Sequence, residues 1–159
     1  MSNNAFNQLL NQGRLDPSAV VIAPPVVVTD SAVVATPAAY AGRTVLLDRA
    51  AGIAVTLPAA TGSGVSYKFL VKTSITSNST TIKVANATDV MQGLAVVLGA
   101  AVAAFATGAT ADTITFNGST TGGLFGTQVE LVDVAAGFWS VIVHATGSGT
   151  AATVFSATV

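Results

Sequence analysis

An eight-residue pattern that occurs twice constrains the fold of this chain more than any other feature. Residues 46–53 have the sequence LLDRAAGI and residues 131–138 have LVDVAAGF, so an aspartate, two alanines and a glycine hold the same relative places. Apolar and polar residues alternate on both sides of each copy, which is typical of half-buried strands. Each copy therefore predicts a β-hairpin with a three-residue loop, in which Gly52 or Gly137 adopts positive φ. We expect both aspartates to serve the turns and not a ligand site.

The loop lengths also predict which residues face each other across each hairpin. The expected pairs are Leu47 with Val55, Val45 with Leu57, Leu131 with Val141, and Val129 with Val143. Trp139 falls on the buried face of the second hairpin. The opposite face of that hairpin carries the polar residues Gln128, Glu130, Ser140 and His144.

Short alternating segments separated by turn residues continue along most of the chain, which has 159 residues. Their spacing predicts an all-β fold of eight to eleven strands, as an antiparallel β-sandwich or a jelly-roll-like single domain. We expect the β-domain to span residues 42–144. Residues 145–159 form either a last strand or a second arm.

The sequence of residues 1–41 predicts an extended N-terminal arm. Residues 3–12 favour a short helix, and four prolines keep residues 14–41 extended and out of any central strand, so that this segment is a free arm or adds an edge strand. Apolar side chains in such an arm need a partner, which is either the arm's own domain or a neighbouring subunit. The predicted partner contacts in the arm and the tail are Phe6, Leu9, Leu10, Arg14, Val21, Ile22, Val27 and Phe155.

Charge is scarce, since only 8% of residues are charged and the net charge is −1. The absence of net basic charge argues against nucleic acid as a partner. So few charges suit a chain that covers much of its surface with copies of itself or with another protein. Residues 41–83 carry most of the basic side chains and residues 84–159 only acidic ones. Either these two halves pack together or unlike patches meet between subunits.

Residues 90–111 contain no charged side chain. Their length would allow a membrane-spanning helix, but the glycines, the threonines and the lack of flanking basic residues argue against one. We predict two buried strands, at residues 94–98 and 102–105, and no membrane partner. An alanine-rich helix is the alternative for this segment.

No catalytic or cofactor site is evident in the sequence. There is one histidine and no cysteine, and the acidic residues are scattered, so neither a metal site nor a catalytic group is predicted. His144 and Glu130 share a strand face, which we interpret as surface polar matching. The glycine-rich loop at residues 59–64 lacks the Lys-Ser/Thr ending of a phosphate-binding loop. Residues 1–14 also lack the pattern of a secretory signal. We expect no enzyme activity and no cofactor.

Two stretches resemble a motif of structural proteins of tailed bacteriophages. Residues 45–64 contain LLD, AAG and TLPAATGSG, and residues 112–139 contain DTITFNG, TTGG and GFW. The resemblance covers about a third of the chain and is nearest to capsid decoration, or cement, proteins.

This resemblance implies a protein made in the cytoplasm of the bacterial host and located on the outer capsid surface of the virion. It also implies a homo-oligomer that binds the major capsid protein and bridges neighbouring capsomers; a trimer is favoured, with a dimer as the alternative. Tail fibres use similar segments, so a tail-fibre or receptor-binding β-module is the other candidate function. Such a module would present aromatic side chains on an exposed loop or bind sugar.

Overall fold

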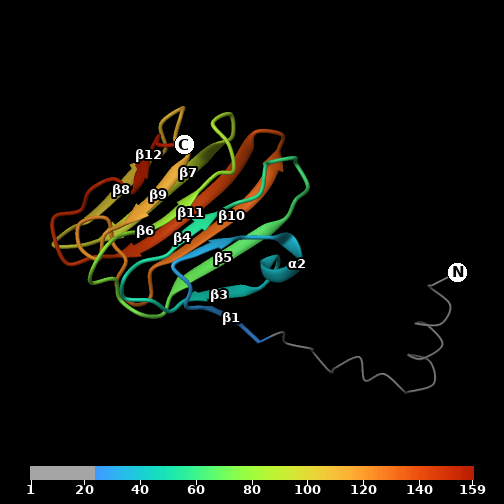
Figure 1. Cartoon of the computed structure of the whole chain (residues 1–159). Helices are drawn as coiled ribbons and strands as arrows, with labels where there is room; N and C mark the ends of the chain where they lie inside the picture. Colours follow the sequence, from blue (N-terminus) through green and yellow to red (C-terminus); the bar gives the residue numbers. More distant parts are fainter. Residues whose placement is uncertain (1–23) are drawn as a thin grey trace, which may run out of the picture.

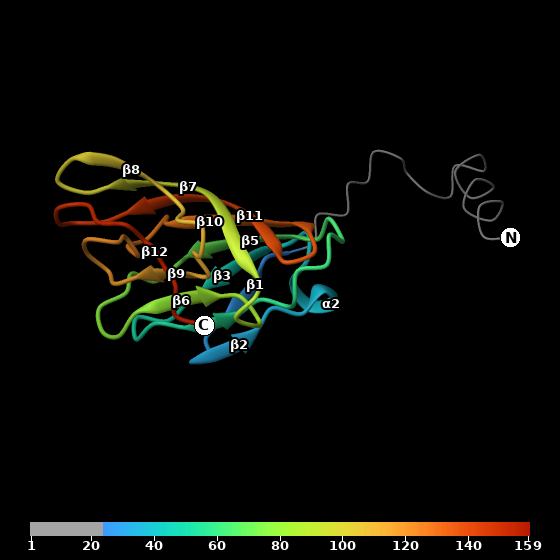
Figure 2. The same ribbon diagram turned by 90° about the horizontal axis from the view of Figure 1, so that it is seen from above.

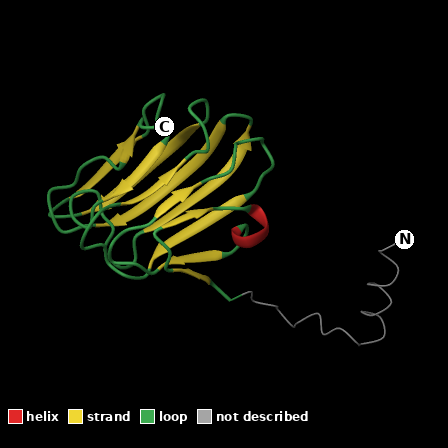
Figure 3. Cartoon of the chain, in the orientation of Figure 1, coloured by secondary structure: helices red, strands yellow, loops and turns green. Residues whose placement is uncertain are grey.

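The computed structural model describes residues 24–159 of the chain (Figure 1). Nearly every regular element in this part is a β-strand, and its one helix, α2 (Pro37–Tyr40), is a single turn (Figure 3). In residues 24–159, twelve strands form two sheets that pack face to face (Figure 2). The predicted all-β sandwich is therefore confirmed, with one strand more than the expected maximum. The helix predicted at residues 3–12 lies outside the described residues.

The larger sheet has seven strands and the smaller has five. In spatial order, the larger sheet contains β1 (Val26–Val28), β3 (Thr44–Leu47), β5 (Ser66–Val71), β10 (Gln128–Ala135), β11 (Phe138–Thr146), β7 (Val90–Leu98) and β8 (Val102–Ala106). The smaller sheet contains β12 (Phe155–Ser156), β9 (Thr113–Phe116), β6 (Thr80–Lys83), β4 (Ala54–Thr56) and β2 (Ala32–Val34).

The first six strands alternate between the two sheets, so consecutive strands lie in opposite layers. β1, β3 and β5 run parallel in the larger sheet, and β2, β4 and β6 run parallel in the smaller sheet. The chain thus passes around the sandwich three times before the later strands complete both sheets. Five strand pairings are parallel and five are antiparallel. The predicted antiparallel or jelly-roll-like pairing is therefore corrected to a mixed sandwich.

The hairpin predicted around Gly52 is wrong. β3 pairs with β5, where Val45 lies opposite Phe69, and β4 belongs to the other sheet, where Val55 lies opposite Ile82. The turn between β3 and β4 crosses from one layer to the other, and Gly52 does adopt a positive φ of 74°. Val45, Leu47 and Val55 are nevertheless buried, because each strand turns one side toward the shared core.

The second hairpin is confirmed. β10 and β11 are antiparallel neighbours, with Leu131 opposite Val141 and Val129 opposite Val143, as the three-residue loop predicts. Gly137 has the expected positive φ of 80°. Local pattern and tertiary structure agree here because the two strands are neighbours in the sheet as well as in the sequence.

Residues 90–111 form strands as predicted, and the helical alternative is wrong. β7 and β8 are an antiparallel pair joined by a turn at residues 99–101. Burial was overestimated, however, because only the inward side of the pair is covered, and Leu94, Leu98 and Val102 are exposed. No helix in the described part of the chain is long and apolar enough to cross a membrane.

Residues 24–41 belong to the body. β1 and β2 are the outermost strands at one end of the two sheets, and Val28 is buried in the core. The boundary predicted between residues 41 and 42 therefore does not mark where the sheets begin. Arg43 fixes the entry of the chain, since its Nη2 donates a hydrogen bond to the carbonyl oxygen of Pro24 at 2.7 Å. At the other terminus, β12 pairs with β9, so the tail ends in a last strand.

Large aromatic side chains fill the space between the sheets. Trp139 is fully buried, as predicted, and its ring centroid lies 5.8 Å from that of Tyr67. Tyr67 in turn stacks on Phe69, with ring centroids 6.2 Å apart. Phe116, Phe155 and Met91 also belong to the core, and the rest of it is built from small and branched apolar residues.

Candidate interaction surface

The glycine-rich loop at residues 59–64 holds a carboxylate of the protein itself. Asp133 is buried and accepts hydrogen bonds from the backbone N–H groups of Thr61, Gly62 and Ser63 at 2.7–3.1 Å. The hydroxyls of Thr61 and Ser63 donate two more. The anion-binding backbone of the loop is therefore occupied, and the loop has a structural role.

Hydrogen bonding governs the charge state of this carboxyl. Burial alone would raise the pKa of Asp133, but the hydrogen bonds from Ser63, Gly62 and Thr61 outweigh burial and hold the pKa well below its usual range. Asp133 is therefore ionised and links β10 to the loop through these hydrogen bonds. The equivalent residue in the first copy of the repeat, Asp48, instead pairs at the surface with Lys72 at 2.6 Å.

Two other buried aspartates also hold loops. Asp89 accepts a hydrogen bond from the backbone N–H of Ala60 at 2.8 Å. Asp112 accepts backbone hydrogen bonds from Thr158 at 2.8 Å and from Val159 at 3.2 Å, which fixes the end of the chain. Within residues 24–159, no three His, Cys, Asp or Glu side chains are grouped so that they could hold a metal ion.

His144 and Glu130 share the outer face of the larger sheet, but each interacts with another residue. Glu130 forms an exposed ion pair with Lys68 at 2.8 Å, and the hydrogen bond from Lys68 lowers the pKa of Glu130. The ring nitrogen Nδ1 of His144 lies 3.2 Å from Nε2 of Gln128. These contacts fit the interpretation of surface polar matching.

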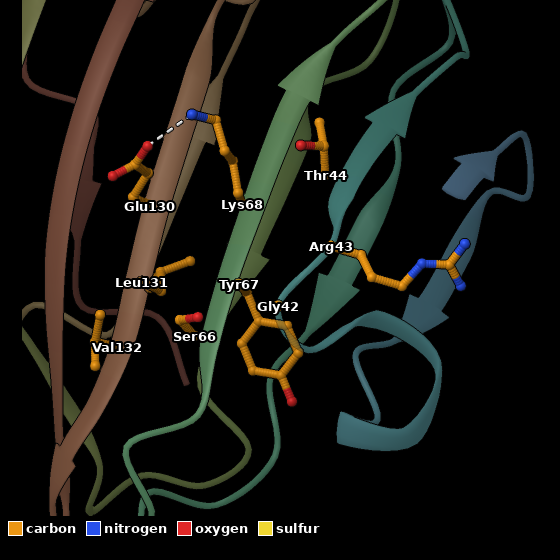
Figure 4. A pocket seen from close by; sticks show the side chains of 9 residues that line it. All are labelled: Gly42, Arg43, Thr44, Ser66, Tyr67, Lys68, Glu130, Leu131 and Val132. Atoms are coloured by element: carbon orange, nitrogen blue, oxygen red, sulfur yellow. Dashed lines mark hydrogen bonds and ion pairs between the residues drawn. The ribbon is translucent and has the colours of Figure 1, made fainter. Parts of the chain in front are cut away.

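The ion pair borders a shallow hollow on the same face (Figure 4). Its volume is about 280 Å³, and its lining includes Gly42, Thr44 and Ser66. Apart from the Lys68–Glu130 pair, the lining offers no acid–base or nucleophilic arrangement. We therefore assign no chemical role to the hollow.

The outer face of the larger sheet also exposes a cluster of large apolar side chains. They lie on the four strands β10, β11, β7 and β8, which are neighbours in that order. This apolar face consists of Val132, Phe138, Ile142, Leu94, Leu98 and Val102. Register places Ile142 directly beside Leu94, and Leu98 directly beside Val102. Val132 lies opposite Ser140 and Ser140 lies beside Gln92, so polar side chains stand between some of the apolar ones. Exposed apolar side chains that gather over neighbouring strands are typical of an interaction site.

Of the predicted partner contacts, two lie in the described residues. Val27 is 49% exposed on the edge strand β1, which leaves it accessible. Phe155 is buried in β12 beside Ile114, so its side chain is occupied within the subunit. Their contact with a partner stays a prediction. The predicted contacts outside the described residues are Phe6, Leu9, Leu10, Arg14, Val21 and Ile22.

The sequence reasoning missed the apolar face, although a signal was present. Residues 94–98 have the sequence LAVVL, with apolar side chains at odd and even positions alike. A strand with one solvent-facing side alternates, whereas an unbroken apolar run is typical of a strand covered on both faces. The sequence alone therefore predicts burial of this run within the subunit, but the sandwich covers only one face of it. Comparison with known proteins found no matching family model, no matching curated protein and no matching solved structure.

Proposed function

We propose that this chain is a structural virion protein, which binds the outer surface of a bacteriophage capsid and stabilises the shell by bridging neighbouring capsomers. In this proposal it acts as a homo-oligomer bound to the major capsid protein, without catalysis. The single observation that carries the proposal is the apolar face, from Val132 on β10 to Val102 on β8. The resemblance of residues 45–64 and 112–139 to decoration proteins supplies the class of partner.

The energetics support a docking role for this face. Complete burial of one Val, Leu, Ile or Phe side chain contributes about 1.5–3 kcal/mol. The six side chains are only partly exposed, so covering them contributes roughly 1 kcal/mol each before the cost of association. A capsid lattice presents many identical sites to which such a surface can bind.

The charges next to the apolar face fit the rim of an interface. Lys68 and Glu130 neutralise each other beside it, so the surface has no strong field of one sign. Interfaces commonly combine an apolar centre with a polar, hydrated rim. We therefore expect capsid binding to depend weakly on salt, because exposed ion pairs are screened and apolar contacts are not.

One observation favours the tail-fibre or receptor-binding alternative. Phe125, in the loop between β9 and β10, is 69% exposed, and an aromatic ring on a loop can contact a receptor or a sugar. Trp139, the only tryptophan, is buried and unavailable for this role. The apolar face covers four strands and Phe125 is a single residue, so capsid binding remains the preferred proposal.

Co-sedimentation with capsids that lack this protein tests the proposal. The variant Ile142→Lys places a charge in the apolar face at an exposed position, and Thr81→Lys on the outer side of the smaller sheet is the matched control. We expect the unmodified protein and the control to bind equally and Ile142→Lys to bind at least about tenfold more weakly. Glu130, opposite position 142, is already paired with Lys68, so burying the added charge costs more than about 1.4 kcal/mol. Failure of the unmodified protein to bind, or unchanged binding of Ile142→Lys, would contradict the proposal.

A further inference from the structure

The four edges of the two sheets are not alike. β1 and β2 have three residues each and β12 has two. Pro24 and Pro25 precede β1, and Pro37 closely follows β2. Short edge strands and nearby prolines are protections against pairing with another chain. β8, the other edge strand of the larger sheet, lacks both protections (Figure 2). It is five residues long and lies in the uncharged, proline-free segment 90–111.

The hydrogen bonds of the β7–β8 pair show which backbone groups of β8 have no partner within residues 24–159. At one end, the N–H of Gly99 donates to the carbonyl oxygen of Ala101, and at the other the N–H of Thr107 donates to that of Gly93 at 3.0 Å. Hydrogen-bonded pairs alternate with non-bonded pairs in an antiparallel ladder. Odd-numbered residues of β8 therefore bond to β7. The N–H and C=O groups of Val102, Ala104 and Ala106 point to the open edge.

These free groups are complementary to themselves. If a second copy of β8 runs antiparallel about a two-fold axis at Ala104, Ala104 faces its own counterpart. Val102 then faces Ala106 of the second copy, and Ala106 faces Val102 of the second copy. Each facing pair exchanges two backbone hydrogen bonds, which gives six bonds in all and satisfies every outward group of the strand. A two-fold interface requires this kind of self-complementary surface.

The side chains permit the same arrangement. The residues that would face each other are valine and alanine, which are small, and no charge lies within the strand to repel its copy. Val102 is 69% exposed and lies beside Leu98 on the apolar face. Pairing through β8 therefore buries apolar surface as well as backbone groups, and it continues the apolar face of one copy into that of the other.

We propose that two copies of this chain associate through β8 to form a dimer with a continuous fourteen-stranded sheet. The dimer is a property of the protein itself and does not depend on capsid binding. It would place two apolar faces on the same side of the joined sheet, so both could contact one surface at once. A trimer, which the resemblance favours, would have to use another contact.

A charge-swap experiment at Ala104 tests the two-fold register. Ala104 is exposed on the outer face, so Ala104→Lys and Ala104→Glu leave the core unchanged. Two lysines, or two glutamates, would face each other across the axis, whereas a mixture would place lysine opposite glutamate. Ala32→Lys is the matched control, because Ala32 is an exposed alanine on the edge strand β2. Mass and affinity are measured by analytical ultracentrifugation of the full chain without capsids.

We expect the unmodified protein and Ala32→Lys to be dimers. Each Ala104 variant alone should associate at least about tenfold more weakly, and the equimolar mixture should recover dimers in low salt. Circular dichroism confirms that each variant is folded. A monomeric unmodified protein, a trimer, an oligomer that Ala104→Lys leaves unchanged, or a mixture that does not recover dimers would each overturn the proposal.

Discussion

The buried carboxylate of Asp133 accepts a hydrogen bond of 2.7 Å from the backbone N–H of Gly62, 71 residues earlier in the chain. This contact ties the loop before β5 to the strand β10, which is the neighbour of β5 in the larger sheet. It shows that the two copies of the sequence repeat have diverged in role. Asp133, in the second copy, is buried and holds a loop by hydrogen bonds, whereas Asp48, in the first copy, forms a surface ion pair with Lys72.

Replacing Asp133 with asparagine should therefore destabilise the fold much more than the same change at Asp48. An asparagine at position 133 loses the charge and turns an N–H₂ group toward backbone donors, so we expect a loss of about 3 kcal/mol in the free energy of unfolding. Asp48→Asn weakens an exposed ion pair, and its effect should be clearly smaller. Urea unfolding of both variants measures the difference. Equal losses would contradict a pinning role for Asp133.

The same carboxyl should make stability depend on pH. The pKa of Asp133 in the folded state is lower than the value of about 3.9 expected for the unfolded chain. Its stabilisation is therefore complete above about pH 5 and is lost as the pH falls toward the folded pKa, because the unfolded chain then binds more protons. We expect Tm to decrease between about pH 5 and pH 2, and the decrease to be smaller in Asp133→Asn. Parallel pH profiles would show that other groups cause the decrease.

The two turn glycines should respond differently to alanine. Both have positive φ, which costs an alanine about 1 kcal/mol. At Gly52 an added Cβ would also lie 2.4 Å from the carbonyl oxygen of Ser79, whereas at Gly137 its nearest neighbour is the carbonyl oxygen of Thr88, at 3.8 Å. We therefore expect Gly137→Ala to cost about 1 kcal/mol and Gly52→Ala at least about 2 kcal/mol. Thermal or urea unfolding that ranks Gly137→Ala as the more harmful change would contradict this account.

Two N-terminal deletions should show how much β1 contributes to the stability of the fold. Deleting residues 2–23 leaves both sheets intact, so Tm should stay within a few degrees. Deleting residues 2–30 also removes β1, including the buried Val28, and uncovers the edge of β3. We expect this longer deletion to lower Tm by about 5 °C or more, given 2–4 °C per kcal/mol for a chain of this size. Similar Tm values would mean that β1 contributes little to the fold.

The contrast between the two repeats shows what the sequence can and cannot predict here. Alternation correctly identified Val45, Val55, Leu131 and Val141 as inward-facing. It could not identify the neighbouring strand around Gly52, because a hairpin and a turn that crosses between layers bury the same residues. That choice depends on the parallel pairing of β3 with β5, which joins segments about 24 residues apart and leaves no mark in the local pattern.

The apolar face was also beyond what the local sequence pattern could predict. The lack of charge in residues 90–111 was visible in the sequence, but whether its apolar side chains face the core or the outside depends on which sheet lies beneath them. Leu94 and Val102 are exposed because the smaller sheet covers only their inward neighbours. Phe155 shows the reverse, since a residue expected at an interface is buried in the subunit's own core.

Electron cryomicroscopy of capsids with and without the protein tests the central claim most directly. The proposed function predicts additional density on the outer capsid surface, at contacts between capsomers, with the outer side of the seven-stranded sheet and Ile142 turned toward the shell. Density for the sandwich on the tail, or capsids that are identical with and without the protein, would contradict it.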